Sequence, residues 1–306
     1  MKKLAYSLNI DDLKQSILMH LGSKPIIIEP VLVLHDGPSE PLTSLIYKSE
    51  SFQEQFNFIF YDQRGCGKTH RLSNTKLNDL SLDKLYSDLI KTVEFILEYF
   101  KVEKIHILSL GYSSMFSYKY VCDYPQNVRS YVVSGLYTNP LKSLKLSLEY
   151  VDYNYQKKHL TSIRKLKKED AWDETNFIKN YELLINILST VGGHINSRLI
   201  AKLVFLSPNK TIDNWSGIIK SKGTKYALLK EIRKYKLNLE LPKDTNFCII
   251  QGQNDMIANT GLARAHYNKI DSENKAFFVI KEASTLPLVS HPDDFFGFLI
   301  QWMSRF

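Results

Sequence analysis

Hydrophobic runs rich in β-branched or aromatic residues alternate with polar stretches near the start of the chain. Residues 26–28, 31–34 and 56–61 are three such runs, and each predicts a strand, with Pro30 marking a break between the first two. Residues 80–100 instead carry apolar side chains at helical spacing, which predicts one long helix. The chain therefore begins with short strands followed by a helix.

The same alternation continues after that helix. Residues 104–108 and 131–133 have the composition of buried strands, and residues 115–124 predict a helix between them. Strand–helix–strand units of this kind place parallel strands in one sheet and cover the sheet with helices. We therefore predict an α/β fold with a mostly parallel central sheet and helices on both faces.

The middle of the chain has a different pattern. Residues 137–235 are rich in Lys and Leu at helical spacing and hold no convincing strand, so we predict a helical insertion there. The strand pattern resumes at residues 246–250 and 276–280, and a last helix is predicted at residues 293–306. The expected organisation is one α/β core that is interrupted by a helical cap. The core comprises residues 1–136 and 236–306, and the cap comprises residues 137–235.

Charge and composition narrow the function classes. The chain has 306 residues with 44% hydrophobic and 24% charged residues, which is globular composition. The formal net charge is +8, but the lysines are spread along the chain, and the densest basic cluster, residues 164–168, is followed at once by Glu169 and Asp170. No nucleic-acid motif accompanies this charge, so we expect no nucleic-acid partner.

Cysteines and targeting signals point to a protein of the cytoplasm. The three cysteines show no CxxC spacing for zinc and are too few for a disulfide framework. Asp11 and Asp12 precede any apolar run, which argues against a signal peptide, and no stretch is long and apolar enough to span a membrane. We expect a cytoplasmic protein with no cofactor, no metal and no membrane contact; the sequence leaves the oligomeric state open.

Two loop motifs follow predicted strands. His35-Asp36-Gly37-Pro38 places a Gly-Pro turn after residues 31–34, at the position where open α/β sheets bind ligands, although a plain turn is an equal alternative. DQRGCGKT follows residues 56–61 and ends like a phosphate-binding loop. That loop would need Gly at position 62, where Asp62 would repel phosphate, and the residues after it show no clear helix. We therefore do not expect nucleotide binding.

Together, HDGPSEP and YDQRGCGKT resemble the HGGPG and DQRGxGxS loops of prolyl aminopeptidases and related α/β-hydrolases, in the same order and at a similar spacing. The resemblance extends over nearly the whole chain. Residues 107–128 are similar to the nucleophile strand, elbow and helix of that family, residues 205–208 to its SPE-type cap segment, and residues 252–255 to its acid-bearing turn. The resemblance implies an α/β-hydrolase fold with a helical cap, and a family reaction that hydrolyses an N-terminal residue from a peptide.

The residues at the implied catalytic positions depart from the family. Its elbow reads G-x-S-x-G, with the nucleophilic serine at a strained strand-to-helix turn. The strand at residues 104–108 and the helix end at residues 124–128, which resembles HPERV in relatives, place Gly111 at the nucleophile position. Ser109 and Ser113 flank it as the small residues that the turn demands. Glycine relieves the backbone strain of this turn but supplies no hydroxyl.

Only the acid of the implied triad is retained. Asp255 stands at the acid position, whereas Thr285, in a register set by Pro287, stands where the family has its histidine. A threonine hydroxyl cannot shuttle protons near neutral pH. We therefore expect Asp255 to bind Thr285 or water instead of an imidazole.

The resemblance also implies an oxyanion hole. Its donors are the backbone N–H groups of Asp36 or Gly37 and of Tyr112, which would also contact a ligand. Asp36 replaces a glycine of the family motif and brings negative charge close to this hole. That charge disfavours an oxyanion.

Other assignments remain open at this point. Ser113 could be a displaced nucleophile with His291 as its base, although this needs bulky Met115 at a position for a small residue. Cys66 could act as a thiolate but is more simply a small turn residue, and His35 either braces its loop or lines a pocket. His106 lies inside a strand, where a buried structural role is expected. Trp215 and Tyr112 are candidates to line a pocket under the cap.

Three functions are compatible with these residues. The first is a non-hydrolytic protein that binds a small-molecule or peptide-like ligand under the cap. The second is a lyase, cyclase or isomerase that uses Asp255, His35 or Asp36 as acid or base. The third is a serine hydrolase or aminopeptidase with a displaced nucleophile such as Ser113.

Overall fold

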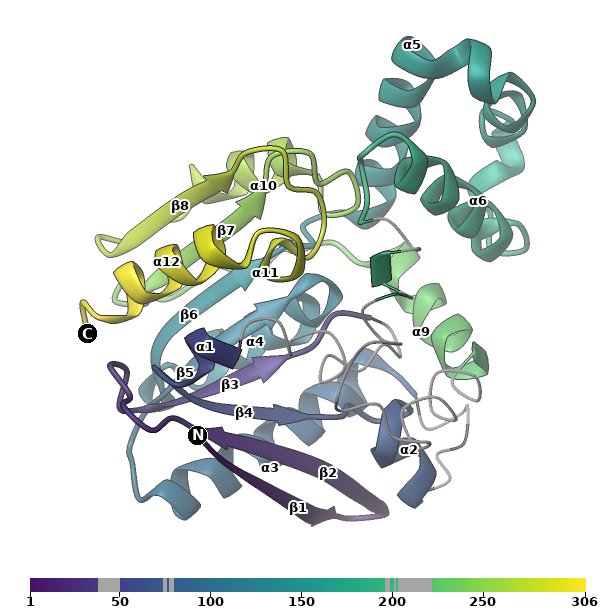
Figure 1. Ribbon diagram of the computed structural model, residues 1–306. Helices are drawn as coiled ribbons and strands as arrows, with labels where there is room; N and C mark the ends of the chain where they lie inside the picture. The colour runs from purple at the N-terminus through teal and green to yellow at the C-terminus, as the bar shows by residue number, and fades with distance from the viewer. Residues whose placement is uncertain (38–49, 74–75, 77–79, 196–198, 201, 203–221) are drawn as a thin grey trace.

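Eight strands form one mostly parallel sheet in the computed structural model (Figure 1). The structure describes residues 1–306 except 38–49, 74–75, 77–79, 196–198, 201 and 203–221. The strand order is β1-β2-β4-β3-β5-β6-β7-β8; β1 and β2 run antiparallel to their neighbours, and the strands from β4 to β8 pair in parallel. The strands are β1 (Lys2–Ile10), β2 (Leu13–Leu21), β3 (Pro30–Leu34), β4 (Asn57–Tyr61), β5 (Ile105–Leu110), β6 (Val128–Ser134), β7 (Phe247–Gly252) and β8 (Lys275–Ile280).

The N-terminal hairpin was not among the predicted strands. In β1, Leu4, Tyr6, Leu8 and Ile10 alternate with polar or small residues, the period of a half-buried strand. The turn after β1 begins at Asp11, whose φ of 48° is one that aspartate tolerates better than most residues. The alternation was therefore readable in the sequence.

The strand predicted at residues 26–28 is wrong. The N–H groups of Ile26 and Ile27 donate to the carbonyl of Gln55, and the segment bends instead of extending. Pro30 does not break a strand but begins β3, a position that needs no ladder N–H from its residue. Ile28 is 74% exposed, so a hydrophobic run alone did not indicate burial here.

Alternating strand residues build a core on each face of the sheet. On one face Leu32, Ile59 and Ile107 pack against helices α3 and α4; on the other, Val33 and Leu108 belong to the core that contains α12. The described helices of the core are α1 (Glu50–Gln53), α2 (Gly67–Ser73), α3 (Leu82–Phe100), α4 (Ser114–Asp123), α10 (Thr260–Tyr267), α11 (Pro287–Ser290) and α12 (Pro292–Met303). The predicted helices at residues 80–100, 115–124 and 293–306 are thus confirmed. Helix α3 begins where the Ser81 side chain accepts the Lys84 N–H.

Helices also occupy the chain between β6 and β7. The described ones are α5 (Pro140–Leu166), α6 (Phe177–Thr190) and α9 (Lys222–Lys234), and α5 has non-helical backbone at Tyr155 and His159. Figure 1 shows these helices on the side toward which the arrowheads of the parallel strands point. The predicted bounds of the core and the cap, and a capping role, stay predictions.

The register aligns the ends of the central strands. Leu34 pairs with Ser109, Leu110 pairs with Ser134, and Gly252 pairs with Ile280. The loops that follow β3, β5, β6 and β7 therefore meet at one edge of the sheet. Within the described residues, no helix is both long enough and apolar enough to cross a membrane.

Candidate functional site

The turn after β5 has the geometry of a sharp strand-to-helix connection. β5 ends at Leu110, Gly111 has a φ of 52°, and a 3-10 turn over Gly111–Ser113 leads directly into α4. Gly135, at the end of β6, also has a positive φ of 83°. A Cβ on Gly135 would lie 3.3 Å from the Cα of Gly111, so the two backbones pass very close together. Glycine at both positions permits this approach.

Asp36 reaches from the loop after β3 to this turn. Its Oδ1 accepts the backbone N–H of Tyr112 at 2.9 Å. A Cβ placed on Gly111 would overlap the Asp36 carboxylate. The Asp36 carboxylate thus occupies the space that a side chain at position 111 would need, and it binds the backbone N–H of the next residue, Tyr112. Gly37, the other residue expected near an oxyanion, lies in the turn after Asp36 and is partly exposed.

Ser113 points into the core instead of toward this carboxylate. It is fully buried, and its Oγ lies 2.7 Å from Ser109 Oγ, accepts the Leu110 N–H and approaches the carbonyls of Leu110 and Leu34. His291 stands at the start of α12, with Nδ1 2.9 Å from the hydroxyl of its neighbour Ser290. No hydrogen bond joins Ser113 to His291 in the described structure.

Asp255 is held on the turn after β7. Its Oδ1 accepts the N–H groups of Ile257 and Ala258, each at 2.9 Å, and its Oδ2 accepts Gln251 Nε2 at 3.1 Å. Burial raises the pKa of Asp255 to about 7, and the nearby charge of Asp36 adds to the rise, while the three hydrogen bonds oppose it. The carboxyl is therefore poised to change its protonation state near neutral pH.

Gln251 was missed in the sequence. Besides Asp255, its amide donates to the Ala258 carbonyl, and its Oε1 accepts the Gly135 N–H at 3.1 Å. The residue therefore connects the ends of β6 and β7 beneath the acid. Its position just inside a hydrophobic strand gave a weak signal, because buried amides in strands are rare unless they are hydrogen-bonded.

Thr285 does not bind Asp255, which corrects the expected contact. Its hydroxyl instead accepts the N–H of Ile195 at 2.9 Å, and Ile195 belongs to the segment that follows α6. The three donors to Asp255 described above come from its own turn and from Gln251, not from Thr285. Thr285 therefore links the loop after β8 to the helical part of the chain.

His35 has the loop-bracing role. Its Nδ1 lies 2.6 Å from the Asp36 carbonyl, and its Nε2 accepts the Gln63 N–H at 3.1 Å. Gln63 returns a bond from its side chain to the His35 carbonyl and accepts the Tyr112 hydroxyl at 2.8 Å. Acceptance at Nε2 places the proton of a neutral ring on Nδ1. His35 and Gln63 thus tie the loops after β3 and β4 to the elbow.

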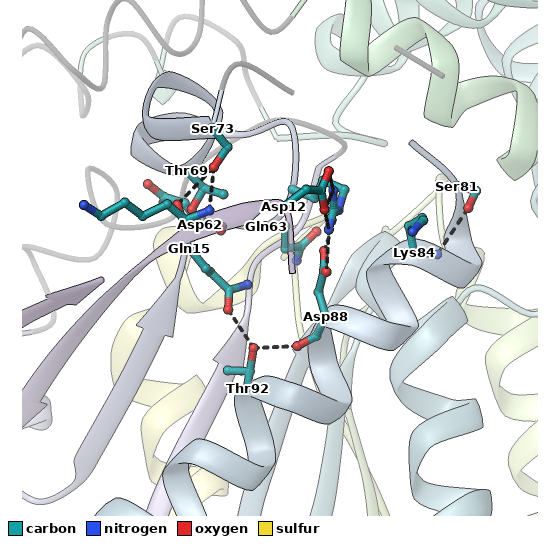
Figure 2. Close-up of polar contacts among 12 residues, drawn as sticks. Asp12, Gln15, Asp62, Gln63, Thr69, Ser73, Ser81, Lys84, Asp88 and Thr92 are labelled. Carbon is teal, nitrogen blue, oxygen red and sulfur yellow. Dashed lines mark hydrogen bonds and ion pairs between the residues drawn. The ribbon is translucent and has the colours of Figure 1, made fainter. Parts of the chain in front are cut away.

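The loop after β4 caps its own helix. Contrary to the prediction of no clear helix, α2 begins at Gly67, and the Asp62 Oδ2 accepts the Lys68 N–H at 2.8 Å (Figure 2). Burial raises the pKa of Asp62 to about 6. The Asp62 carboxylate therefore occupies the N-terminus of this helix, where it would repel a phosphate. That GCGKT binds no phosphate stays a prediction. Cys66 lies buried in this loop.

Arg64 anchors this loop to α3. Its guanidinium donates twice to Asp88, at 2.9 Å each, and pairs more loosely with the exposed Asp12 of the N-terminal turn. Figure 2 shows Asp88 beside Thr92, whose hydroxyl reaches Gln15 of β2 at 2.8 Å. The Arg64 and Asp88 side chains are each 3% exposed, so the pair is almost fully desolvated. The pair has a structural role away from the elbow.

A small cavity lies between the elbow and the acid. Its volume is about 10 Å³, and its lining includes Asp36, Gly111, Ser134, Tyr137, Asp255 and Thr285. The structure therefore brings together the residues predicted for the nucleophile, acid and histidine positions, whereas Ser113 lies outside this lining. The described residues hold no cluster of three or more His, Cys, Asp or Glu side chains able to bind a metal.

Of the remaining predicted residues, one has a structural role, and the others lie outside the part of the chain that the structure describes. His106 is buried in β5 and lies 2.8 Å from the Ser130 hydroxyl through Nδ1. Burial lowers its pKa to about 3, with a further contribution from Arg129, so the ring is neutral and structural. Trp215 and residues 205–208 lie outside the described residues.

Comparison with known proteins identifies the fold. A family model described as "alpha/beta hydrolase fold" matches residues 30–173. The chain is 25% identical over 165 residues to a proline iminopeptidase of Lactobacillus acidophilus, covering 51% of this chain and 52% of the relative. It is 28% identical over 159 residues to one of Saccharolobus solfataricus, covering 50% of each chain. The chain thus spans about half the length of these curated relatives.

Solved structures match along the whole chain. The proline iminopeptidase of Mycobacterium smegmatis aligns with a TM-score of 0.71 and 11% identity, covering 99% of this chain and 98% of its own. A proline iminopeptidase-related protein of Thermus thermophilus aligns with a TM-score of 0.64 and 16% identity at the same coverage. An epoxide hydrolase of Vigna radiata aligns with a TM-score of 0.62 and 15% identity, covering 99% of each chain. These likenesses establish the fold alone.

Proposed function

We propose that this chain, an α/β-hydrolase-fold protein similar to the proline iminopeptidases, is a non-hydrolytic ligand-binding protein. The observation that carries the proposal is the seat of Asp36, whose carboxylate accepts the Tyr112 N–H and fills the space that a side chain at position 111 needs. Under the family resemblance, Gly111 stands at the nucleophile position. The place of an attacking hydroxyl is then taken by a carboxylate from another loop.

Electrostatics at this turn oppose hydrolysis. Acyl transfer develops negative charge on an oxygen, which hydrolases stabilise with backbone N–H donors aimed at that oxygen. Here the N–H of Tyr112 already donates to Asp36. The Asp36 carboxylate, 2.9 Å from the Tyr112 nitrogen, would repel a developing oxyanion, and this repulsion is strong in a partly buried site. The same interaction that orders the elbow therefore works against the reaction.

The proton-transfer position supports the same proposal. Thr285 takes the place that the resemblance gives to histidine, and its hydroxyl accepts the Ile195 N–H. A hydroxyl has no pKa near neutrality and cannot serve as general base. By analogy with triad knockouts, loss of nucleophile and base together costs several orders of magnitude in rate.

Ser113 is a poor substitute nucleophile in this geometry. Its hydroxyl is buried, and its hydrogen bonds go to Ser109 and to backbone groups of Leu110 and Leu34. A nucleophile must reach substrate and hold a bond to its base. The surroundings of Ser113 favour a role in stabilising the turn.

We further propose that residues 137–235 act as a cap and that a small-molecule or peptide-like ligand binds between cap and core. Two contacts tie the segment after α6 to the site: Ile195 N–H to Thr285, and Gly193 carbonyl to the Met256 N–H at 3.0 Å. Met256 directly follows Asp255. These contacts connect the segment to Thr285 and to the residue next to the acid.

Activity-based labelling tests the loss of hydrolysis. The full chain and a Ser113→Ala variant are treated with a fluorophosphonate probe and assayed with N-terminal prolyl and alanyl amides, beside a proline iminopeptidase as positive control. We expect no labelling and no turnover above buffer for either protein. Labelling of Ser113, or turnover that disappears in Ser113→Ala, would overturn the proposal.

A second candidate function rests on the pKa of Asp255, which burial raises to about 7 beside a small cavity. A carboxyl with such a pKa suits general acid–base chemistry, as in a lyase, cyclase or isomerase. Turnover of any substrate with a pH dependence that is lost in Asp255→Ala would favour this candidate over simple binding.

A further inference from the structure

The cavity beside Gly111 has the size of one small group. Its volume of about 10 Å³ is close to the minimum that a single water-sized group requires. Its lining also includes Tyr137, Ile257 and Ala258. Whatever binds here therefore enters with one non-hydrogen atom, and branched groups are too large.

The Asp255 carboxylate still has room to accept a hydrogen bond in this cavity. Its Oδ1 already accepts two N–H groups, from Ile257 and Ala258, whereas its Oδ2 accepts only Gln251 Nε2. Each carboxylate oxygen accepts about two hydrogen bonds. One acceptor site on Oδ2 is thus left for a donor.

Ser134 provides the second, independent indication. Ser134 lines the cavity and is 4% exposed, and its Oγ has no hydrogen-bond partner among the described residues. A buried hydroxyl without a partner loses the hydrogen bonds that it makes in water, so native structures rarely leave one unpaired. A polar group in the cavity would restore that partner.

Charge selects the class of group. Asp36 and Asp255 carry the same sign, and the described lining contains no Lys, Arg or His. Their mutual repulsion disfavours an anion and favours a donor that carries positive charge. A tetrahedral ammonium group donates in several directions and matches acceptors that come from separate strands.

We propose that this cavity binds a primary ammonium group, with Asp255, Asp36 and the Ser134 hydroxyl as acceptors. The proposal deepens the proposed ligand-binding function and rests on it, because it assigns the ligand an amine. Free ammonium and the ammonium end of a larger ligand share this chemistry, and the experiment separates them.

The test measures thermal unfolding of the full chain, followed by intrinsic fluorescence in an amine-free buffer at pH 8 and constant ionic strength. Ammonium, methylammonium, ethylammonium, potassium and tetramethylammonium chlorides are titrated in parallel. A ligand that binds only the folded state raises Tm in proportion to the logarithm of its concentration once that concentration exceeds the Kd. We expect such a rise with ammonium and none with tetramethylammonium. Rises with the two alkylammonium ions identify the end of a larger ligand, whereas a rise with ammonium alone identifies the free ion; both results support the site.

Three variants locate the effect. Asp255→Asn should weaken ammonium affinity at least tenfold, and Ser134→Ala about threefold, whereas Asp244→Asn, which removes an exposed carboxylate elsewhere, should leave it unchanged. Ser134→Ala should also be no less stable than the parent without ammonium, because it removes an unpartnered buried hydroxyl. A purely structural role for Ser134 would not produce that combination.

Several outcomes would overturn the proposal. They are the absence of any rise in Tm with ammonium, an equal rise with potassium, and a rise that survives in both Asp255→Asn and Ser134→Ala. If Asp255→Asn does not fold, Ser134→Ala alone decides. Fluorophosphonate labelling addresses the hydrolytic reaction separately, so failure of the ammonium site and failure of the proposed function give different results.

Discussion

The loops after β3 and β4 lie on the same edge of the sheet, but the carboxylates near them have different surroundings. After β4, Asp62 accepts a helix N–H, and Arg64 pairs with the buried Asp88. After β3, Asp36 faces the elbow, and its charge raises the pKa of Asp255 in addition to the effect of burial. After β4 the buried Arg64–Asp88 ion pair stabilises the fold, whereas after β3 the like charges of Asp36 and Asp255 lie close enough to affect each other. Perturbed pKa values beside a cavity are more frequent at functional sites than elsewhere, which makes the Asp36 side the candidate for function.

The largest expected effect on stability comes from breaking the buried ion pair near the loop after β4. Arg64→Met leaves Asp88 buried without its cation, which should lower the free energy of unfolding by about 3–5 kcal/mol. Urea denaturation measures the change. The double variant Arg64→Met with Asp88→Leu should recover much of the loss, because it buries no unpaired charge.

The control for this prediction is an exposed ion pair on α3. Lys91→Ala removes a pair with Glu94 in which both side chains are more than half exposed, and it should change stability by no more than about 0.5 kcal/mol. An Arg64→Met protein as stable as Lys91→Ala would contradict the structural role assigned to the buried pair.

The raised pKa of Asp255 should make the stability of the protein depend on pH. Burial raises the pKa of Asp255 from 3.8 to about 7, so between these values the folded chain binds more protons than the unfolded chain. Stability must then fall as pH rises through this window and level off above it. At about 1.4 kcal/mol per pKa unit, Asp255 contributes on the order of 2–3 kcal/mol of loss between pH 5 and 8.

Asp255→Asn removes this contribution and should flatten the pH profile of stability in amine-free buffer. Asp62, whose pKa is about 6, acts in the same direction and is present in both proteins, so the comparison isolates Asp255. Asp244→Asn serves as the exposed control and should retain the parent profile. Identical profiles for Asp255→Asn and the parent would show that this carboxyl does not titrate in the window.

A smaller effect is expected at the elbow. Gly111→Ala forces a side chain into the left-handed region and displaces the Asp36 carboxylate from the Tyr112 N–H, at a cost of about 1–3 kcal/mol. In an Asp36→Gly background only the backbone strain remains, so the two substitutions should couple. Chemical denaturation of the four proteins gives the coupling energy.

Gly192→Ala is the matched control for strain. Gly192 has a φ of 80°, and no atom lies within 4 Å of the position that a Cβ would take there, so its substitution should cost about 1 kcal/mol through the backbone alone. A Gly111→Ala cost that is equal to that of Gly192→Ala and insensitive to Asp36 would contradict the seat of the carboxylate described above.

Much of the architecture was readable as local pattern. The predicted runs at residues 31–34, 56–61 and 104–108 became strands β3, β4 and β5, because their apolar residues are buried on both faces of the sheet. Residues 26–28 failed because three isoleucines, without partner strands, do not determine burial. The hairpin β1–β2 was overlooked although its alternation was present.

The site was only partly predictable. Asp36, Gly111, Asp255 and Thr285 were singled out through loop motifs and their order, and they line one cavity. Gln251 and Ser134 were not predicted as site residues. Each is a polar residue at the end of an apolar strand, and the neighbouring sequence does not indicate which groups it contacts. Neither the bond from Asp36 to Tyr112 nor the one from Ile195 to Thr285 is encoded in any short segment.

The sequence alone determined the alternation of strands and helices, the helical pattern between the strands and the residue types at the strand ends, because these depend on hydrophobic periodicity and turn chemistry within a few residues. Only the tertiary structure decided which carboxylate faces the elbow, where the Ser113 hydroxyl points and what Thr285 binds. Those outcomes depend on strand order and register, which bring residues far apart in the chain within hydrogen-bonding distance.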